Sequence, residues 1–367
     1  MRLFTSAACA TVAVALLAGC SGTNFGSTSS SLPAATAQSR MHGPRFAPLN
    51  MVPAWMLPAG ISRLHLNLRM APAKTHKSLI YASNFYQSEM WGYPDPNSAN
   101  GPATCTLGNA SNYLKYINGF GVDTAGDVMV PAYTPNDDGY LSINVFAPKC
   151  GALLWQAEVD TGQPADAYSS NGATGSILVG ELADYDNNDY GALVICSKAS
   201  SCGTPFTNSA VTGYGAGVAM AKNGDCWLSA ATSTNSGFVL VYFAGCTGTG
   251  EVATGTSNTY YGGLFIDGKG NLGSIDLSGT LYVYSGCNPK CSLVGSTKLE
   301  GEALFGGLDG TSKYLSLGDY ENNAVDIYSY NSKTGTAKYL YSFTNGLTSG
   351  SENLVETAHF APRNKKV

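Results

Sequence analysis

A short run of oxygen-bearing side chains is the first place in this chain where chemistry could occur. Asp184, Asp186 and Asn188 occupy alternate positions, and Asp189 follows them. Calcium takes carboxylate and amide oxygens as ligands at such spacings. The EF-hand pattern, however, requires Gly at its sixth position and Glu at its twelfth. Those positions hold Asp189 and Ile195 in this chain, so a calcium site is not the favoured interpretation.

The same run has a second copy 135 residues later, from Leu317 to Ala324. In this copy Glu321 replaces Asp186, and no aspartate follows the two asparagines. A recurring turn explains both copies, whereas a metal site explains only the first. We therefore predict a turn at both places and no bound metal.

Other candidates for catalysis are few. The histidines form no recognisable constellation with nucleophiles or carboxylates; they are His42, His65, His76 and His359. The sequence contains no Gly-x-Ser-x-Gly elbow and no phosphate-binding glycine loop. No catalytic residue and no cofactor is predicted.

The composition indicates a β-rich fold and argues against one class of partner. Charged residues make up 12% of the chain, which contains 44 Gly and 22 Tyr. The formal net charge is -5, and no run of Lys or Arg interleaved with aromatic residues occurs. Because proteins that bind nucleic acids use basic patches, nucleic-acid binding has no electrostatic support.

An internal repeat sets the expected architecture. Four segments begin with Gly and a short apolar strand, turn through Asp, Asn or Gly, and enter a second strand. They are Gly121–Val128, Gly217–Cys226, Gly263–Leu272 and Gly307–Tyr314, at intervals of 96, 46 and 44 residues. The longest interval has room for a degenerate copy around Asn171-Gly172. Third strands with alternating aromatic residues follow, at Ser142–Phe146, Val239–Phe243, Leu281–Tyr284 and Val325–Tyr328. Such a unit has the length of a propeller blade, ~45 residues.

Each end of the repeat region holds half a blade. Ser78–Ser83 looks like a second strand without a first, and Glu356–Pro362 looks like a first strand without a second. Paired with each other, they complete a blade and close the ring, which removes open sheet edges. The predicted fold is therefore an all-β, six-bladed β-propeller closed by the C-terminal strand.

With this repeat pattern the chain resembles the six-bladed NHL-like and SMP-30-like propellers of bacterial surface proteins, over about Leu79 to Pro362. The SMP-30-like lactonases hold a divalent metal in the central tunnel through Glu, Asn and Asp residues. Glu352-Asn353 precedes the closing strand, where such a Glu would fall, but the accompanying Glu-Gly-Pro and Trp pattern is absent. A metal-dependent hydrolase or lactonase is thus the alternative. The favoured interpretation is a non-catalytic binding or scaffold protein.

Aromatic residues recur before the expected first strands and are the candidate ligand-binding residues. They are Phe120, Tyr168, Tyr214, Tyr260, Tyr261 and Phe305. Loops at these positions would lie near one mouth of a propeller's central channel, where exposed rings stack on a glycan or a peptide. Packing between neighbouring blades explains these residues equally well and is the favoured interpretation.

Eight cysteines remain once Cys9 and Cys20 are set aside, and an even number suits disulfides in an oxidising compartment. Cys226 and Cys246 are symmetric about a turn at residue 236, which places them opposite each other on a hairpin. The other expected pairs are Cys196 with Cys202, Cys287 with Cys291 and, by elimination, Cys105 with Cys150. Zinc binding is the alternative, and no histidine nearby supports it.

The N-terminal region predicts export and membrane attachment. Arg2 precedes an apolar run, Ala7–Ala18, that is too short to span a bilayer. The run ends in Leu17-Ala18-Gly19-Cys20, which resembles the lipobox of bacterial lipoproteins and implies a lipid on Cys20; an ordinary signal peptide is the alternative. We expect a signal peptide at 1–19, the lipidated cysteine and a flexible tether at 20–60, and the propeller domain at 61–367. The expected location is the bacterial cell envelope, facing the periplasm or the exterior.

Overall fold

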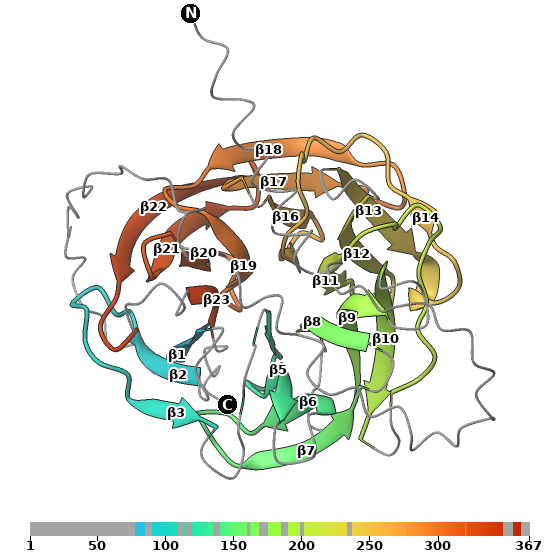
Figure 1. Cartoon of the computed structure of the whole chain (residues 1–367). Coiled ribbons are helices and arrows are strands. Elements are labelled where there is room, and N and C mark those ends of the chain that lie inside the picture. The colour runs from blue at the N-terminus through green and yellow to red at the C-terminus, as the bar shows by residue number, and fades with distance from the viewer. Residues whose placement is uncertain are drawn as a thin grey trace, which may run out of the picture.

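The computed structural model describes residues 78–360, with gaps at 85–89, 109–113, 115–116, 118, 135–139, 160–161, 169–174, 185–189, 199–201, 233–236, 277, 320 and 348–354. Within the described residues the chain forms five four-stranded sheets and one three-stranded sheet. The sheets stand around a common centre as the blades of a propeller (Figure 1). This confirms the predicted six-bladed β-propeller.

In each of the first three blades the strand order runs from the inner strand outward. Blade one consists of β23 (Val355–Phe360), β1 (Ser78–Asn84), β2 (Met90–Asp95) and β3 (Cys105–Leu107). Blade two consists of β4 (Gly121–Val122), β5 (Val128–Thr134), β6 (Tyr140–Phe146) and β7 (Leu153–Glu158). Blade three consists of β8 (Gly162–Tyr168), β9 (Ser176–Asp184) and β10 (Tyr190–Ser197), with a single bridge from Leu193 to Phe206 at its outer edge.

The last three blades have the same order. Blade four consists of β11 (Gly215–Met220), β12 (Cys226–Ala231), β13 (Phe238–Phe243) and β14 (Glu251–Val252), with the short 3-10 helix η5 (Ala244–Cys246) before β14. Blade five consists of β15 (Leu264–Ile266), β16 (Leu272–Asp276), β17 (Thr280–Ser285) and β18 (Ser292–Lys298). Blade six consists of β19 (Ala303–Leu308), β20 (Tyr314–Asp319), β21 (Ala324–Asn331) and β22 (Thr336–Phe343).

The ring is closed by the C-terminal strand, as predicted. β23 pairs antiparallel with β1, in a register that sets Phe360 opposite Ile80 and Ala358 opposite Ala82. The last strand of the chain therefore serves as the inner strand of blade one. In blade three, by contrast, the inner strand β8 ends before the predicted copy at Asn171-Gly172, which lies outside the described residues.

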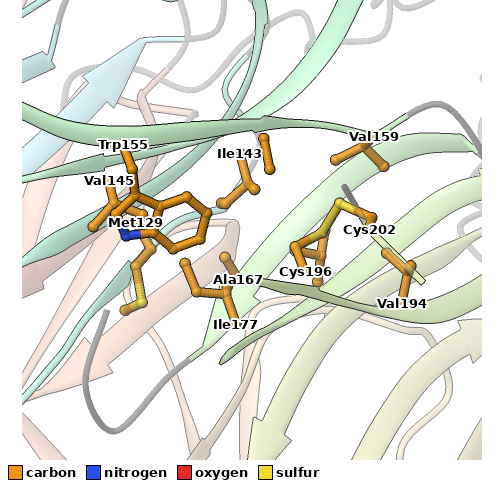
Figure 2. Close-up of a cluster of buried hydrophobic side chains, with 12 residues drawn as sticks. Met129, Ile143, Val145, Trp155, Val159, Ala167, Ile177, Val194, Cys196 and Cys202 are labelled. Carbon is orange, nitrogen blue, oxygen red and sulfur yellow. A yellow bond between two sulfur atoms is a disulfide. The ribbon is translucent and has the colours of Figure 1, made fainter. Parts of the chain in front are cut away.

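The hydrophobic core lies between neighbouring blades. Figure 2 shows the layer between blades two and three, where Trp155, Val145 and Met129 face Ile177 and the Cys196–Cys202 disulfide. Met129 points into this layer, whereas the adjacent Val128 and Val130 belong to the layer beside blade one. Because side chains alternate across a strand, each sheet buries both of its faces. This explains why second strands such as β12 and β16 are buried at every position.

The turns between first and second strands are built around a single aspartate. In blade five, Asp267 Oδ1 accepts hydrogen bonds from the N–H groups of Lys269 and Asn271, at 2.8 and 2.9 Å. Asp123 in blade two and Asp309 in blade six accept backbone N–H groups in the same way. These bonds satisfy turn amides and confirm the predicted Asp-containing turns.

The structure contains the four predicted disulfides, and they are Cys105–Cys150, Cys196–Cys202, Cys226–Cys246 and Cys287–Cys291. Cys105 lies in blade one and Cys150 in the turn after the third strand of blade two, so this bond joins two blades. Such a set of disulfides is typical of an extracytoplasmic protein. No described helix has the length and apolar character needed to cross a membrane.

Candidate functional site

The two ends of the propeller carry different connections between strands. At one end, which we call the crossover face, the chain passes from the outer edge of one blade to the inner strand of the next. The segments 207–214, 253–263 and 299–302 belong to this face. The opposite end holds the first-to-second and third-to-fourth strand turns, which contact one another between blades. There, for example, the Gly268 N–H donates to Ser312 Oγ at 2.9 Å.

Three of the six aromatic residues predicted to bind ligand are poorly placed to do so. Some are buried, and some lie within a strand and not in the loop before it. Phe120 precedes β4 but is fully buried, with its ring 4.7 Å from the His359 ring. Phe305 is 4% exposed and lies inside β19, not before it. Tyr168 is the last residue of β8, so it lies toward the opposite end of the propeller. The predicted position before the first strand is therefore wrong for Tyr168 and Phe305.

The other three aromatic residues share the crossover face. Tyr214 directly precedes β11, and Tyr260 and Tyr261 lie in the segment that leads to β15. All three are half-buried. The segment of Tyr260 and Tyr261 also contacts β11, because the Gly217 N–H donates to the Gly262 carbonyl at 3.2 Å. We call Tyr214, Tyr260 and Tyr261 the tyrosine group, and their role in ligand binding stays a prediction.

A buried carboxylate holds the loop that bears two of these tyrosines. Asp276 is fully buried at the end of β16, and its Oδ2 accepts the N–H groups of Thr259 and Tyr260 at 2.7 and 3.1 Å. The Thr259 hydroxyl donates to the same oxygen at 3.2 Å. One residue earlier, Asn258 Nδ2 donates to Ser274 Oγ at 2.9 Å. The backbone before Tyr261 is thereby fixed by bonds to β16.

Four acidic residues also lie on the crossover face, and they are Glu300, Glu302, Asp319 and Glu321. Burial raises the pKa of Asp319, and burial together with the charges of Glu302 and Asp319 raises the pKa of Glu321. Asp319 also accepts the N–H and the side-chain amide of Asn322, at 3.1 and 2.7 Å. The second copy of the acidic run is therefore a turn, as predicted.

The residues considered as ligands of calcium, or of the metal of a lactonase, are not described by the structure. Asp186, Asn188 and Asp189 lie outside the described residues, as do Glu352 and Asn353, and the side chain of Asp184 is not described either. Among the residues that the structure does describe, no three Asp, Glu, His or Cys side chains are grouped so as to hold a metal ion.

An aspartate that sequence reasoning missed lies where the inner strands meet. Asp166 of β8 is 5% exposed, and its Oδ2 accepts the N–H of Val218 in β11 at 3.1 Å. On its other side, the Gly119 N–H donates to the Ala165 carbonyl at 2.6 Å, and a Cβ at Gly119 would collide with the Asp166 carboxylate. Burial raises the pKa of Asp166 to about 8. This side chain therefore joins blades two, three and four.

A histidine occupies the neighbouring part of the centre. His359 of β23 packs on Phe120, and a Cβ at Gly307 in β19 would collide with its ring. Burial lowers the pKa of His359 below its ordinary value, so the ring is neutral at physiological pH. The inner strands of blades one, two and six thus meet at an uncharged aromatic contact.

Comparison with known proteins places the chain by fold alone. No model of a known protein family matches the sequence, and no curated protein matches it. A chain from the crystal structure of a nidogen–laminin complex superposes with a TM-score of 0.53 at 12% identity, covering 77% of this chain and 98% of that one.

Two bacterial structures give similar matches. A protein of unknown function from Bacteroides caccae has a TM-score of 0.53 at 10% identity, over 77% of this chain and 98% of its own. The periplasmic gluconolactonase PpgL from Pseudomonas aeruginosa has a TM-score of 0.48 at 9% identity, over 78% of this chain and 99% of its own. At these identities the two matches with a TM-score of 0.53 show a shared fold and no shared activity.

Proposed function

We propose that this chain is a lipid-anchored, extracytoplasmic propeller that binds a glycan at its crossover face and catalyses no reaction. Cys20 would hold the lipid, and the tyrosine group would supply the binding surface. Because a propeller fold serves many functions, the proposal has to rest on the site. The observation that supports it is the loop before Tyr261, which Asp276 and Ser274 fix from the buried side.

A fixed loop matters because binding costs the entropy of every group that must be ordered. The N–H groups of Thr259 and Tyr260 are already bonded to Asp276, so the loop needs little rearrangement when a ligand arrives. Tyrosine has a large ring face and few rotatable bonds, which makes it a low-entropy contact residue. The proposed surface is therefore preorganised.

The chemistry of the surroundings suits a sugar chain. Tyrosine rings stack on the apolar faces of sugar rings, and their hydroxyl groups make polar contacts. Glu302 and Glu321, both half-buried on the same face, add oxygen atoms that accept hydrogen bonds from sugar hydroxyls. A ligand with alternating apolar faces and hydroxyl donors matches both features.

The test measures binding of neutral and amino-sugar oligosaccharides by saturation-transfer NMR and calorimetry. We expect at least one of them to bind, with contacts at the tyrosine group. The combined change Tyr260→Ala and Tyr261→Ala should then weaken binding by about 10-fold or more, since an aromatic contact contributes about 1 kcal/mol beyond its buried area. Tyr260→Phe with Tyr261→Phe should retain most of the affinity.

A matched surface control is Leu293→Ala, because Leu293 is 49% exposed on the outer strand β18. This variant should bind like the unchanged protein. Binding that survives the Tyr→Ala changes, or a basic or extended peptide that binds in place of every sugar, would contradict the glycan proposal. Hydrolysis of gluconolactone in the presence of a divalent metal would contradict the non-catalytic part.

A further inference from the structure

Exposed lysines gather at the end of the propeller opposite the crossover face. They lie in first-to-second or third-to-fourth strand turns of five blades, and all are exposed: Lys149, Lys198, Lys222, Lys269, Lys290, Lys313 and Lys333. We call this end the lysine face. Because equivalent turns of all blades emerge at the same end, separate lysines become one surface.

The acidic residues of the lysine face are mostly internal. Asp123, Asp267 and Asp309 are 3 to 5% exposed, and their carboxylates accept backbone N–H groups within their own turns. Asp225 is half-buried and accepts the N–H of Gly245 and the hydroxyl of Tyr242. Among the described residues of this end, Glu251 at the outer edge is the exposed acidic side chain. The solvent-exposed charged side chains described at this end are therefore mostly positive.

Negatively charged side chains are more numerous on the crossover face, and the net charge of the whole chain is -5. Glu300 and Glu302 lie there beside Asp319 and Glu321, with Lys298 as their cationic neighbour. A chain with this net charge is repelled as a whole by an anionic surface. Attraction is strongest in one orientation, with the lysine face turned toward the negative charge.

The point of attachment favours the same orientation. β1 begins at Ser78, which pairs with Asp95 at the end of β2. Both residues lie at the lysine face, so the chain that leads back to Cys20 joins the fold at this end. Attachment at this end lets the lysine face reach the headgroups without the chain passing around the propeller.

A hollow between blades four and five adds a place for one headgroup. It has a volume of about 400 Å³, and its lining includes Lys222, Lys269 and Trp227 together with the carboxylates of Asp225 and Asp267. The Trp227 indole N–H donates to the Cys287 carbonyl at 2.7 Å, which fixes the ring. The two carboxylates already accept hydrogen bonds from backbone N–H groups, which leaves the ammonium groups of Lys222 and Lys269 to bind a phosphate of a phospholipid.

We infer that the lysine face docks on anionic phospholipid headgroups and orients the propeller on the membrane. The interaction adds to any lipid on Cys20 and does not require it, so it stands or fails separately from the proposed function. A lysine near an anionic bilayer contributes ~1 kcal/mol, which corresponds to about fivefold in partition coefficient. Several such contacts, and not any one of them, would set the orientation.

The test uses the full chain with Cys20→Ser, so that no attached lipid contributes, in vesicle flotation. We expect binding to mixed phosphatidylglycerol–phosphatidylcholine vesicles, weakened by salt, and little binding to phosphatidylcholine alone. Lys222→Gln, Lys269→Gln and Lys313→Gln together should lower the partition coefficient on the order of 100-fold. Circular dichroism confirms that the variant is folded.

A matched pair of single changes separates the two faces. Lys269→Gln should lower vesicle binding about fivefold, whereas Lys298→Gln on the crossover face should leave it unchanged. Equal binding to both vesicle types, or an unaffected triple variant, would overturn the inference. So would binding to dextran sulfate without binding to the vesicles, because it would assign the lysine face to a soluble polyanion.

Discussion

The carboxylate of Asp166 accepts the backbone N–H of Val218 at 3.1 Å, across the boundary between blades three and four. This bond links the inner strands β8 and β11, so the side chain fixes the relative position of the two blades. It also brings an ionisable group into the interior, where its charged form is disfavoured.

The first prediction concerns this aspartate and pH. The folded protein keeps the proton on Asp166 up to its pKa of about 8, whereas an unfolded chain releases it near 3.8. Between these values the folded state binds more protons, so the free energy of unfolding should fall as pH rises. The limiting slope from one such group is about 1.4 kcal/mol per pH unit.

Asp166→Asn keeps the oxygen that accepts the Val218 N–H but removes the titration. Urea unfolding at pH 5 to 8 should show a flatter pH dependence for this variant than for the unchanged protein. Asp326, whose pKa burial also raises, stays in both proteins and cancels in the comparison. Parallel curves for the two proteins would show that Asp166 is ionised in the folded state.

The second prediction compares two disulfides. Cys105 and Cys150 are 45 residues apart and join two blades, whereas Cys287 and Cys291 are 4 residues apart. A disulfide that closes a longer loop restricts the unfolded chain more. Replacing both cysteines by Ala should lower the free energy of unfolding by about 4 kcal/mol for the first pair and about 2 kcal/mol for the second. Urea titrations measure both values, and a larger loss for the short loop would contradict the reasoning.

The third prediction tests a turn glycine. Gly270 has a φ of 82° in the turn between β15 and β16, with open space where a Cβ would lie. Gly270→Ala should therefore destabilise the protein through backbone strain alone, by about 1–2 kcal/mol. Gly203→Ala is the matched control, because Gly203 lacks a left-handed φ and its Cβ would make an ordinary contact. Equal thermal unfolding of both variants would refute the strain.

The propeller was predictable because its signals are local and repeated. Each Gly-initiated strand and Asp turn occupies one stretch of sequence, and the strands at Ser78 and Glu356 complete one blade by pairing with each other. The inner strand of blade three was not predicted correctly, because β8 contains Pro164 and Asp166 and has register shifts beside both. It lacks the Gly-plus-apolar pattern found at the inner strands of blades two, four, five and six.

The site was less predictable because its residues come from separate blades. Asp166 has no local motif, and its partner Val218 lies 52 residues away. Asp276 could have been found from the sequence, because an aspartate ends the second strand of its blade at Asp276 and again at Asp319. Phe305 shows the limit of the aromatic pattern, which does not distinguish a residue before a strand from one inside it.

Lysine footprinting on vesicles tests the proposed orientation of the propeller on an anionic membrane. The full chain with a lipid attached at Cys20 would be bound to phosphatidylglycerol-containing or pure phosphatidylcholine vesicles, acetylated briefly, and digested for mass spectrometry. We predict that Lys222, Lys269 and Lys313 lose reactivity on the anionic vesicles, while Lys298 reacts equally on both. Equal reactivity of the lysine face on the two membranes, or protection of Lys298 instead, would contradict that orientation.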